Sequence, residues 1–242
     1  MARDRTTDAG LVVYGVNPVL ELLRSGEAVT RVVLGPGPRR DELADAARRR
    51  GVTVTSGDRQ ALDQLTGGPH HQGVVAETPP FRYTALTSLL EAGLPNLLVL
   101  DGVQDPRNLG AILRTARAAG VGGVVLPQDR SVRVTTVVAI ASAGLLFGLP
   151  IARVPNLVRA MESLKESGFW LVGLVTRGGE DLRRFTPPPR PALVVGGEGE
   201  GLRPLVDRTC DFRVSIPMAA GVESLNVSVA TGIAVFRLLQ QV

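Results

Sequence analysis

The chain has 242 residues, of which 44% are hydrophobic, 21% charged and 4% aromatic, and its formal net charge is +4. This composition is typical of a globular protein of one or two domains, and it excludes a disordered, a collagen-like or a disulfide-stapled chain. The single cysteine, Cys210, cannot form an internal disulfide, so we expect a buried or half-buried thiol and a reducing, cytoplasmic environment.

The charged and apolar residues are distributed as in a cytoplasmic protein. The start of the chain carries charged residues without an apolar segment behind them, and no later run reaches the roughly 18 uninterrupted apolar residues of a membrane span. We therefore expect neither export nor membrane insertion. Of the 27 basic residues only Lys165 is a lysine. Arginine side chains suit phosphate groups and base edges, so the charge is a weak indication of nucleic-acid binding.

Residues 1–79 are predicted to form a small α/β domain. Asn17 followed by Pro18 is typical of a helix start, with a polar N-cap and proline in the first turn. Further helices are expected at 41–50 and 58–65, and strands at 29–34, 52–55 and 73–77. The next segment, 80–95, contains Pro80, Gly93 and Pro95, and we interpret it as an interdomain linker with a short helix at 86–91.

In residues 96–242 apolar strand patterns alternate with helical patterns, which predicts an α/β domain with a mostly parallel sheet covered on both faces. The expected strands are 96–100, 123–126, 149–154, 170–175, 192–196 and 212–216, and the expected helices are 108–119, 135–146, 157–167, 202–208 and 224–240. A Rossmann-like domain would be the default interpretation. However, the turn at 101–110 lacks the G-x-G-x-x-G pattern, and no Walker A loop is present, so the sequence argues against a nucleotide-phosphate site of either familiar kind.

Three polar or glycine-rich loops follow strands of this domain, where open α/β sheets bind their ligands. The first runs from Asp101 towards Arg114, the second covers 196–201, and the third covers 216–226. Each has a purely structural interpretation: Asn108 can cap the following helix, Ser224 or Asn226 can cap the last helix, and Glu198 and Arg114 can be solvated surface residues. Taken singly, the loops leave both interpretations open.

Together the three loops closely resemble the three motifs of the SpoU/TrmH family of RNA 2′-O-ribose methyltransferases. The segments that carry the resemblance are 100–121 (LDGVQDPRNLGAILRTARAAGV), 194–202 (VVGGEGEGL) and 215–230 (SIPMAAGVESLNVSVA). Residues 13–19 (VYGVNPV) and 71–76 (HQGVVA) are similar to the N-terminal substrate-binding domain of the family, so the resemblance covers almost the whole chain. The two-domain layout is most similar to members that methylate a guanosine of 23S ribosomal RNA.

The resemblance implies a catalytic domain with a C-terminal trefoil knot that binds S-adenosylmethionine, working as a homodimer on RNA without a metal ion. By position in the motifs, the catalytic set would be Asn108, Arg114, Glu198, Ser224 and Asn226. The backbone of Gly196, Ile216 and Leu225 would hold the cofactor. The third motif commonly has its glycine directly after Met-Ala, whereas here Ala220 takes that place and Gly221 follows, so we expect a local backbone adjustment.

The chemistry of the implied reaction limits the role of these residues. A ribose 2′-hydroxyl is a poor nucleophile that needs in-line positioning, a nearby base and exclusion of water, and the motifs contain no histidine. Our hypothesis is that Arg114 grips the phosphate beside the target ribose and polarises its hydroxyl, because a guanidinium normally stays protonated. The four other polar residues would fix the nucleotide and the arginine.

Other interpretations of the sequence remain open. Within the same class, the chain could methylate transfer RNA or confer antibiotic resistance by methylating ribosomal RNA; from another class, it could be a catalytically silent RNA-binding protein. The only histidines, His70 and His71, are too few for a metal site and favour a turn or an RNA contact. The arginine pairs and runs at 39–40 and 48–50 are either RNA-binding patches or solvated helix faces.

Overall fold

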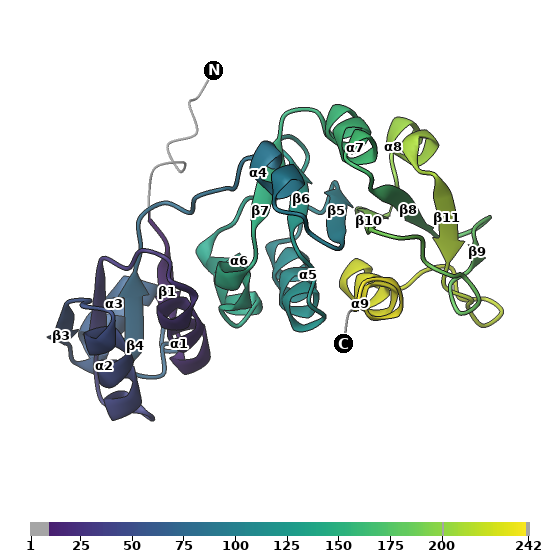
Figure 1. The fold of residues 1–242 in the computed structure, drawn as a ribbon. Coiled ribbons are helices and arrows are strands. Elements are labelled where there is room, and N and C mark those ends of the chain that lie inside the picture. The colour runs from purple at the N-terminus through teal and green to yellow at the C-terminus, as the bar shows by residue number, and fades with distance from the viewer. Residues whose placement is uncertain (1–9, 200, 241–242) are drawn as a thin grey trace, which may run out of the picture. The chain divides into compact units, whose positions relative to one another are not determined.

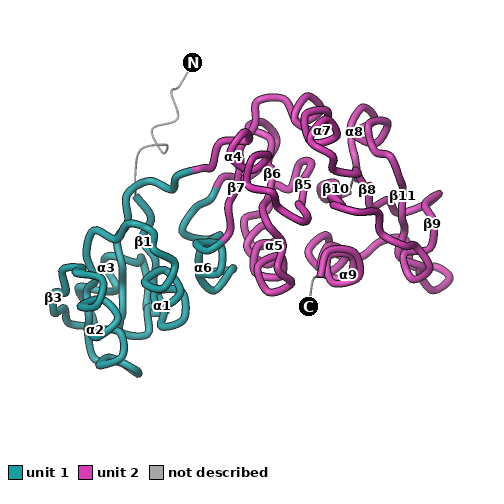
Figure 2. The backbone as a smooth tube through the Cα atoms, viewed as in Figure 1, with its two compact units in different colours: residues 1–82, 134–148 teal, residues 83–133, 149–242 magenta. Residues whose placement is uncertain are grey.

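The computed structural model describes residues 10–199 and 201–240, which divide by their contacts into two compact units. The first unit comprises residues 1–82 and 134–148, and the second comprises 83–133 and 149–242 (Figure 2). Within the described ranges, no helix combines the length and the apolar character needed to cross a membrane.

The first unit is a small mixed sheet with helices packed against it. Its elements are β1 (Val12–Tyr14), α1 (Val16–Ser25), β2 (Arg31–Leu34), α2 (Arg40–Arg49), β3 (Val54–Ser56), α3 (Arg59–Thr66), β4 (Val74–Glu77), α6 (Thr136–Ala141) and a 3-10 helix at Leu145–Gly148. The strand order is β1-β4-β2-β3, in which β4 is antiparallel to both β1 and β2. The predicted small α/β architecture is therefore confirmed.

Residues 134–148 pack with this unit, although the sequence analysis assigns them to 96–242. The backbone N–H of Val12 donates a hydrogen bond to the Thr136 hydroxyl at 3.2 Å. A Cβ on Gly144 would lie 2.6 Å from the carbonyl oxygen of Pro18, so the glycine allows close approach to α1. Such contacts between segments far apart in the chain cannot be read from local patterns.

The second unit is built on a parallel sheet with helices on both faces. Its elements are α4 (Leu86–Glu91), β5 (Leu97–Asp101), α5 (Pro106–Ala118), β6 (Val124–Pro127), β7 (Ile151–Val154), α7 (Leu157–Glu166), β8 (Trp170–Val175), β9 (Glu180–Asp181), β10 (Pro191–Gly196), α8 (Pro204–Thr209), β11 (Phe212–Ser215) and α9 (Val227–Leu238). The strand order is β7-β6-β5-β10-β8-β11-β9, and each pair of neighbouring strands in this order is parallel. Helices α4, α7 and α8 lie on one face, and α5 and α9 on the other (Figure 1).

The apolar residues of the central strands alternate between the two faces, as a buried parallel sheet requires. Leu97 and Val99 of β5 pack with α4, α7 and α8, together with Leu89 of α4. The segment 80–95 that was predicted as a linker thus contains a helix, at the predicted bounds, whose Leu89 is buried in the core of the second unit.

Several helix starts differ from the sequence expectation because more than one polar or small residue is available as a cap. Helix α1 begins at Val16 with Gly15 as the N-cap residue, so the prediction that Asn17 caps it is wrong. Helix α5 begins at Pro106 and is capped by Asp105, so Asn108 is not the cap. Helix α9 begins at Val227, three residues later than predicted.

The single cysteine lies in the core of the second unit, and the expectation of a buried thiol is confirmed. The Cys210 Sγ contacts the carbonyl oxygen of Val206 at 3.4 Å. Burial, followed by the nearby Asp207 carboxylate, raises the pKa of the Cys210 thiol to about 12. The thiol is therefore protonated at neutral pH and is a poor nucleophile.

The histidines lie in a turn of the first unit. His71 is buried, and its Nδ1 accepts a hydrogen bond from the backbone N–H of Gly73 at 2.9 Å, while its Nε2 lies 3.2 Å from Oδ1 of Asp63. Among the described residues, no group of three or more His, Cys, Asp or Glu side chains could hold a metal ion. His71 therefore stabilises the turn that precedes β4, as one of the two interpretations proposed.

The buried side chain of Asn96 joins the end of α9 to the sheet. Its Nδ2 donates to the carbonyl oxygen of Leu239 at 2.6 Å, and its Oδ1 accepts from the backbone N–H of Gly122 at 2.9 Å. Replacing Asn96 by alanine leaves both backbone groups without this partner, at a cost of about 1 to 3 kcal/mol for each buried group.

We predict that Asn96→Ala lowers the free energy of unfolding by about 3 kcal/mol, measured by urea denaturation. The control is Gln128→Ala, at an exposed residue, which should change it by less than about 0.5 kcal/mol. Equal stability of the two variants would show that Asn96 does not anchor α9.

Candidate active site

Three loops from distant parts of the chain meet at the carboxyl edge of the parallel sheet. The first follows β5, the second follows β10, and the third follows β11 and leads into α9. Strands β5 and β10 are direct neighbours, with Asp101 opposite Gly196 in the register. Helix α9 returns across the sheet to pack on α5 and β10, which brings the third loop to the first two. The trefoil knot implied by the resemblance stays a prediction.

A chain of two hydrogen bonds links one side chain from each loop. Nδ2 of Asn108 donates to Oε1 of Glu198 at 2.7 Å, and Nδ2 of Asn226 donates to Oδ1 of Asn108 at 3.1 Å. The amide of Asn108 thus bridges a carboxylate and a second amide. Three of the five predicted catalytic residues are therefore in one hydrogen-bonded cluster.

The helix caps leave these side chains free to make the cluster. Asp105 caps α5 by accepting hydrogen bonds from the backbone N–H groups of Arg107 at 2.6 Å and Asn108 at 3.2 Å. The side chain of Asn108, in the first turn of α5, is thereby available for the other loops. Asn226 both caps α9 and joins the cluster. Its Oδ1 accepts a hydrogen bond from the backbone N–H of Ser228 at 2.9 Å, and its Nδ2 donates to Asn108.

Glycines let the backbones of the loops come into direct contact. A Cβ on Gly196 would lie 2.0 Å from the carbonyl carbon of Gly201, and a Cβ on Gly197 would lie 2.2 Å from the carbonyl oxygen of Gly102. Any side chain at these positions would push the loops apart. The glycines of the second loop are therefore required by packing against its own far end and against the first loop.

An ion pair that the sequence analysis missed joins the end of β5 to the segment that follows the glycine-rich loop. The carboxylate of Asp101, at the end of β5, accepts hydrogen bonds from Nε of Arg203 at 2.6 Å and from its backbone N–H at 2.9 Å. The side chain of Asp101 is completely buried. An acidic residue that directly ends an apolar strand was the available signal, but its partner lies about a hundred residues further on and could not be identified from spacing.

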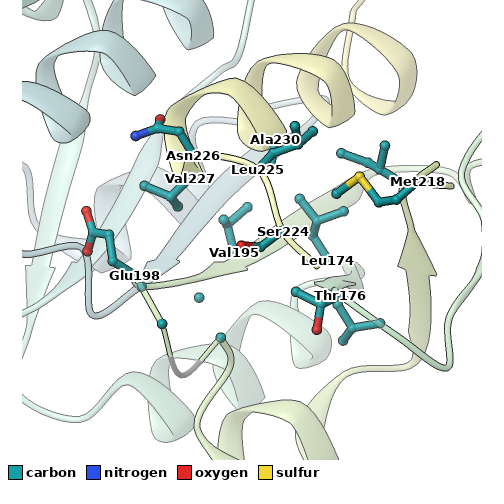
Figure 3. Close-up of a pocket in the computed structure, with 16 residues that line it drawn as sticks. Leu174, Thr176, Val195, Glu198, Met218, Ser224, Leu225, Asn226, Val227 and Ala230 are labelled. Carbon is teal, nitrogen blue, oxygen red and sulfur yellow. The ribbon is translucent and has the colours of Figure 1, made fainter. Parts of the chain in front are cut away.

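A cavity of about 360 Å³ lies between the glycine-rich loop, the third loop and α9 (Figure 3). Its lining includes all three residues predicted to hold a cofactor, Gly196, Ile216 and Leu225, and three of the predicted catalytic residues, Glu198, Ser224 and Asn226. Residues that the sequence analysis did not single out complete it: Leu174, Val175, Thr176, Val195, Gly197, Gly199, Gly201, Met218, Val227 and Ala230. The lining is mostly apolar with a few polar groups, which is typical of a small-molecule site.

The missed lining residues come mainly from the ends of strands and the start of α9. Leu174 and Val175 end β8, the strand between β10 and β11 in the sheet. The expected strand at 170–175 was found at the predicted bounds, but the order of the strands was needed to place its end at the site.

Arg114 does not line the cavity. It lies on α5, between one and two turns after Asn108, and its side chain is exposed. Within the described part of the chain, it makes no side-chain hydrogen bond or ion pair that would hold it in one place. Its guanidinium is therefore available to a ligand that approaches from solvent.

The displaced glycine of the third loop has a structural reason. The backbone N–H of Val222 donates to the carbonyl oxygen of Ala219 at 3.2 Å, which closes a turn. Gly221 has φ +83° in this turn, in the region that glycine adopts without strain, whereas Ala220 is not among the positive-φ residues. The order Ala220-Gly221 thus suits a turn with its left-handed residue at position 221.

Two families of known proteins match almost the whole chain. Residues 95–236 match the SpoU rRNA Methylase family, and residues 12–84 match the domain described as RNA 2′-O ribose methyltransferase substrate binding. The first match covers the parallel-sheet region with all three loops, and the second falls on the small mixed sheet.

Individual relatives extend over the full length. The chain is 42% identical to the 23S rRNA (guanosine-2′-O-)-methyltransferase RlmB of Xanthomonas campestris pv. campestris, covering 95% of this chain and 96% of the relative. It is 39% identical to the putative TrmH family tRNA/rRNA methyltransferase YacO of Bacillus subtilis, covering 95% of each chain. A crystal structure of an AdoMet-bound rRNA methyltransferase from Sinorhizobium meliloti superposes with a TM-score of 0.81 at 28% identity, covering 97% of this chain and 88% of that one.

The close approach of the two ends of the glycine-rich loop generates a prediction about stability. Gly196→Ala forces the new Cβ against Gly201 and should lower the free energy of unfolding by about 3 kcal/mol, measured by urea denaturation. The matched control is Gly68→Ala, because a Cβ on Gly68 meets open space and its backbone is not left-handed. That control should be neutral or slightly stabilising. A Gly196→Ala variant as stable as the control would contradict the packing described for the loop.

Proposed function

The chain belongs to the SpoU rRNA methylase family and is an RNA 2′-O-ribose methyltransferase, and from that premise we propose that its substrate is a guanosine of 23S ribosomal RNA in the cytoplasm. The relative at 42% identity is named for that reaction, whereas the relative at 39% is named for tRNA or rRNA. Transfer RNA is therefore the alternative substrate. The single observation that carries the substrate proposal is the 42% identity, over 95% of this chain, to a relative named for that reaction. The meeting of Asn108, Glu198 and Asn226 beside one cavity supports methyl transfer at this place.

The cavity suits S-adenosylmethionine, which we propose as the methyl donor. Its volume of about 360 Å³ lies in the range of small-molecule sites. Gly196, Gly197 and Gly199 line it without side chains, so part of its wall is backbone. Apolar side chains such as Leu174 and Leu225 can cover an adenine ring, and the backbone of Gly196, Ile216 and Leu225 can hold the adenosine. When bound, S-adenosylmethionine supplies an electrophilic methyl group on a sulfonium.

The polar cluster at the mouth of the cavity would orient the nucleotide. Asn108 holds the Glu198 carboxylate in place through a 2.7 Å hydrogen bond, and Asn226 holds the amide of Asn108. Ser224, at the cavity wall, offers a hydroxyl that can donate or accept a hydrogen bond. These groups can fix the ribose so that its 2′-oxygen attacks in line, the geometry on which such a transfer depends.

Arg114 would bind the RNA phosphate next to the target ribose. Its guanidinium is exposed on the same helix as Asn108, and guanidinium groups bind phosphate through two parallel hydrogen bonds. A bound arginine would also polarise the 2′-hydroxyl while staying protonated itself. The role assigned to Arg114 is thus to position the reacting group and stabilise developing negative charge.

The outer face of α9 supports a homodimer. Val229, Ile233 and Phe236 are 51%, 43% and 45% exposed and are spaced so that they form one stripe along the helix. An apolar stripe of this kind is typical of a surface covered by a partner. We propose that a second copy of the chain covers it.

The substrate proposal is tested by incubating the protein and labelled S-adenosylmethionine with total RNA and mapping the methylated ribose. We expect label on the 2′-oxygen of a guanosine in 23S ribosomal RNA. Label in transfer RNA alone would replace the ribosomal assignment by the alternative.

A substitution at Arg114 tests its role in catalysis. Arg114→Lys keeps the charge but loses the two parallel donors, so turnover should fall by about 10²-fold. The affinity for S-adenosylmethionine, measured by calorimetry, should stay unchanged because Arg114 does not line the cavity. The matched control is Arg117→Lys, in the last turn of the same helix, which should keep its activity. Near wild-type turnover of Arg114→Lys would rule out a bidentate role.

The dimer proposal is tested by sedimentation analysis. Ile233→Asp places a charge in the middle of the stripe and should shift the protein from dimer to monomer, whereas Leu205→Asp, at an exposed leucine of α8, should not. A wild-type protein that sediments as a monomer at micromolar concentration would contradict the dimer.

A further inference from the structure

A second cavity, of about 380 Å³, borders the same glycine-rich loop. It shares Gly197, Glu198 and Gly201 with the first cavity, so the loop is a wall common to both. Its other lining residues lie at the end of β5, in the segments that follow β5 and β6, and before α8: Asp101, Gly102, Gln104, Arg130 and Arg203. None of these belongs to the site residues that the sequence predicts.

Arg130 is the available cation of this cavity. The other guanidinium, of Arg203, is engaged by the buried carboxylate of Asp101, with Nε 2.6 Å from Oδ1. Arg130, by contrast, is exposed, and in the described ranges its side chain enters no hydrogen bond or ion pair. The five N–H donors of its planar guanidinium are therefore unused by the protein.

Glu198 supplies an acceptor to the same cavity. Its Oε1 accepts the hydrogen bond from Asn108, and its Oε2 lies 3.5 Å from the backbone N–H of Gln104, which is a weak contact. A carboxylate has about four lone-pair positions, so Glu198 can accept further hydrogen bonds. Among the described residues, the cavity thus combines the unpaired guanidinium of Arg130, which can donate, with the Glu198 carboxylate, which can accept further hydrogen bonds.

We propose that this second cavity holds the base of the target nucleotide, with Arg130 donating to guanine O6 and N7 and Glu198 accepting from the amino and imino groups of the base. Guanine offers two acceptors side by side at O6 and N7, the pair that an arginine fork matches. Adenine presents an amino group where guanine has O6, and that group would face the guanidinium. The inference rests on the proposed function and names the residue that selects guanosine.

The shared wall connects base recognition to methyl transfer. A nucleotide with its base in the second cavity has its ribose at the rim formed by Glu198 and the glycine-rich loop, next to the first cavity. Correct binding of the base therefore positions the 2′-oxygen for reaction. With an incorrect base, both the turnover and the affinity for the RNA should fall, because the 2′-oxygen of its ribose is then out of line with the methyl group.

The test compares guanosine with 7-deazaguanosine, which lacks the N7 acceptor, at the position that the wild-type protein methylates. The modified nucleotide is introduced by ligating a synthetic oligonucleotide into the RNA. For the wild-type protein, we expect kcat/KM to fall by about tenfold on the modified RNA. For Arg130→Ala, kcat/KM on the guanosine RNA should fall by at least as much, because the hydrogen bonds to O6 and N7 are both lost, with no further loss on the 7-deazaguanosine RNA.

A matched variant controls for the lost charge. Arg208→Ala removes an arginine from the last turn of α8, which leads to the start of β11 at the opposite edge of the sheet. It should keep the wild-type discrimination between the two RNAs. Affinity for S-adenosylmethionine should be the same in all three proteins, because neither arginine lines the first cavity.

Other outcomes overturn the inference. If the variant Arg130→Ala acts on the 7-deazaguanosine RNA with a kcat/KM lowered by the product of the two separate fold-losses, Arg130 does not contact N7. Should Arg130→Ala fail to fold, Arg130→Met gives the same comparison, because methionine keeps a long unbranched side chain without an N–H donor. If the wild-type protein methylates no ribosomal RNA, the proposed function fails; the second cavity is then tested by the binding of guanosine and 7-deazaguanosine oligonucleotides, followed by fluorescence anisotropy, and equal affinities of the wild-type protein would reject it.

Discussion

The arrangement of the site depends on backbone contact between loops that only glycine permits. Gly196 lies against Gly201, and Gly197 lies against Gly102, at distances that leave no room for a Cβ. The ion pair between the buried Asp101 and the half-buried Arg203 fixes the same region. The hydrogen bonds of the polar cluster are exposed and contribute about 1 kcal/mol each, so they orient side chains on a framework that the close backbone packing provides.

The order of the strands in the sheet brings loops that are far apart in the sequence close together in space. Strand β10 lies between β5 and β8, and its neighbour β5 is separated from it by almost a hundred residues. Because parallel strands have their carboxyl ends at one edge, the loops that follow β5, β10 and β11 gather there. One side of the glycine-rich loop borders the proposed cofactor cavity, and the other borders the cavity with Arg130. A short loop with few side chains is thus suited to form a thin wall at whose rim two ligands can come close enough to react.

Much of the fold could be predicted from local patterns, and its limits have physical causes. The strand at 170–175 and the helix at 86–91 have the predicted bounds, because buried strands and short amphipathic helices leave clear apolar patterns. The N-caps at Asp105 and Gly15 were missed, since neighbouring residues compete for the cap position and Gly15 occupies it without a side-chain hydrogen bond. The packing of 134–148 with the first unit and the two-residue strand β9 depend on contacts that no local pattern encodes. The candidate site residues were predicted by resemblance to family motifs, whereas the hydrogen bonds that join three of them through Asn108 required the structure. Arg130 was missed because it stands in an ordinary polar segment, and only the cavity distinguishes it from other exposed arginines.

The central claim is that the three loops form one pocket for a methyl donor. The most direct measurement is a crystal structure of the protein with S-adenosylhomocysteine, the product that the transfer leaves behind. We predict electron density for the adenosine between the glycine-rich loop and the start of α9, with the sulfur directed towards Glu198 and Asn226. Density at any other place, with this cavity filled only by solvent, would contradict the account.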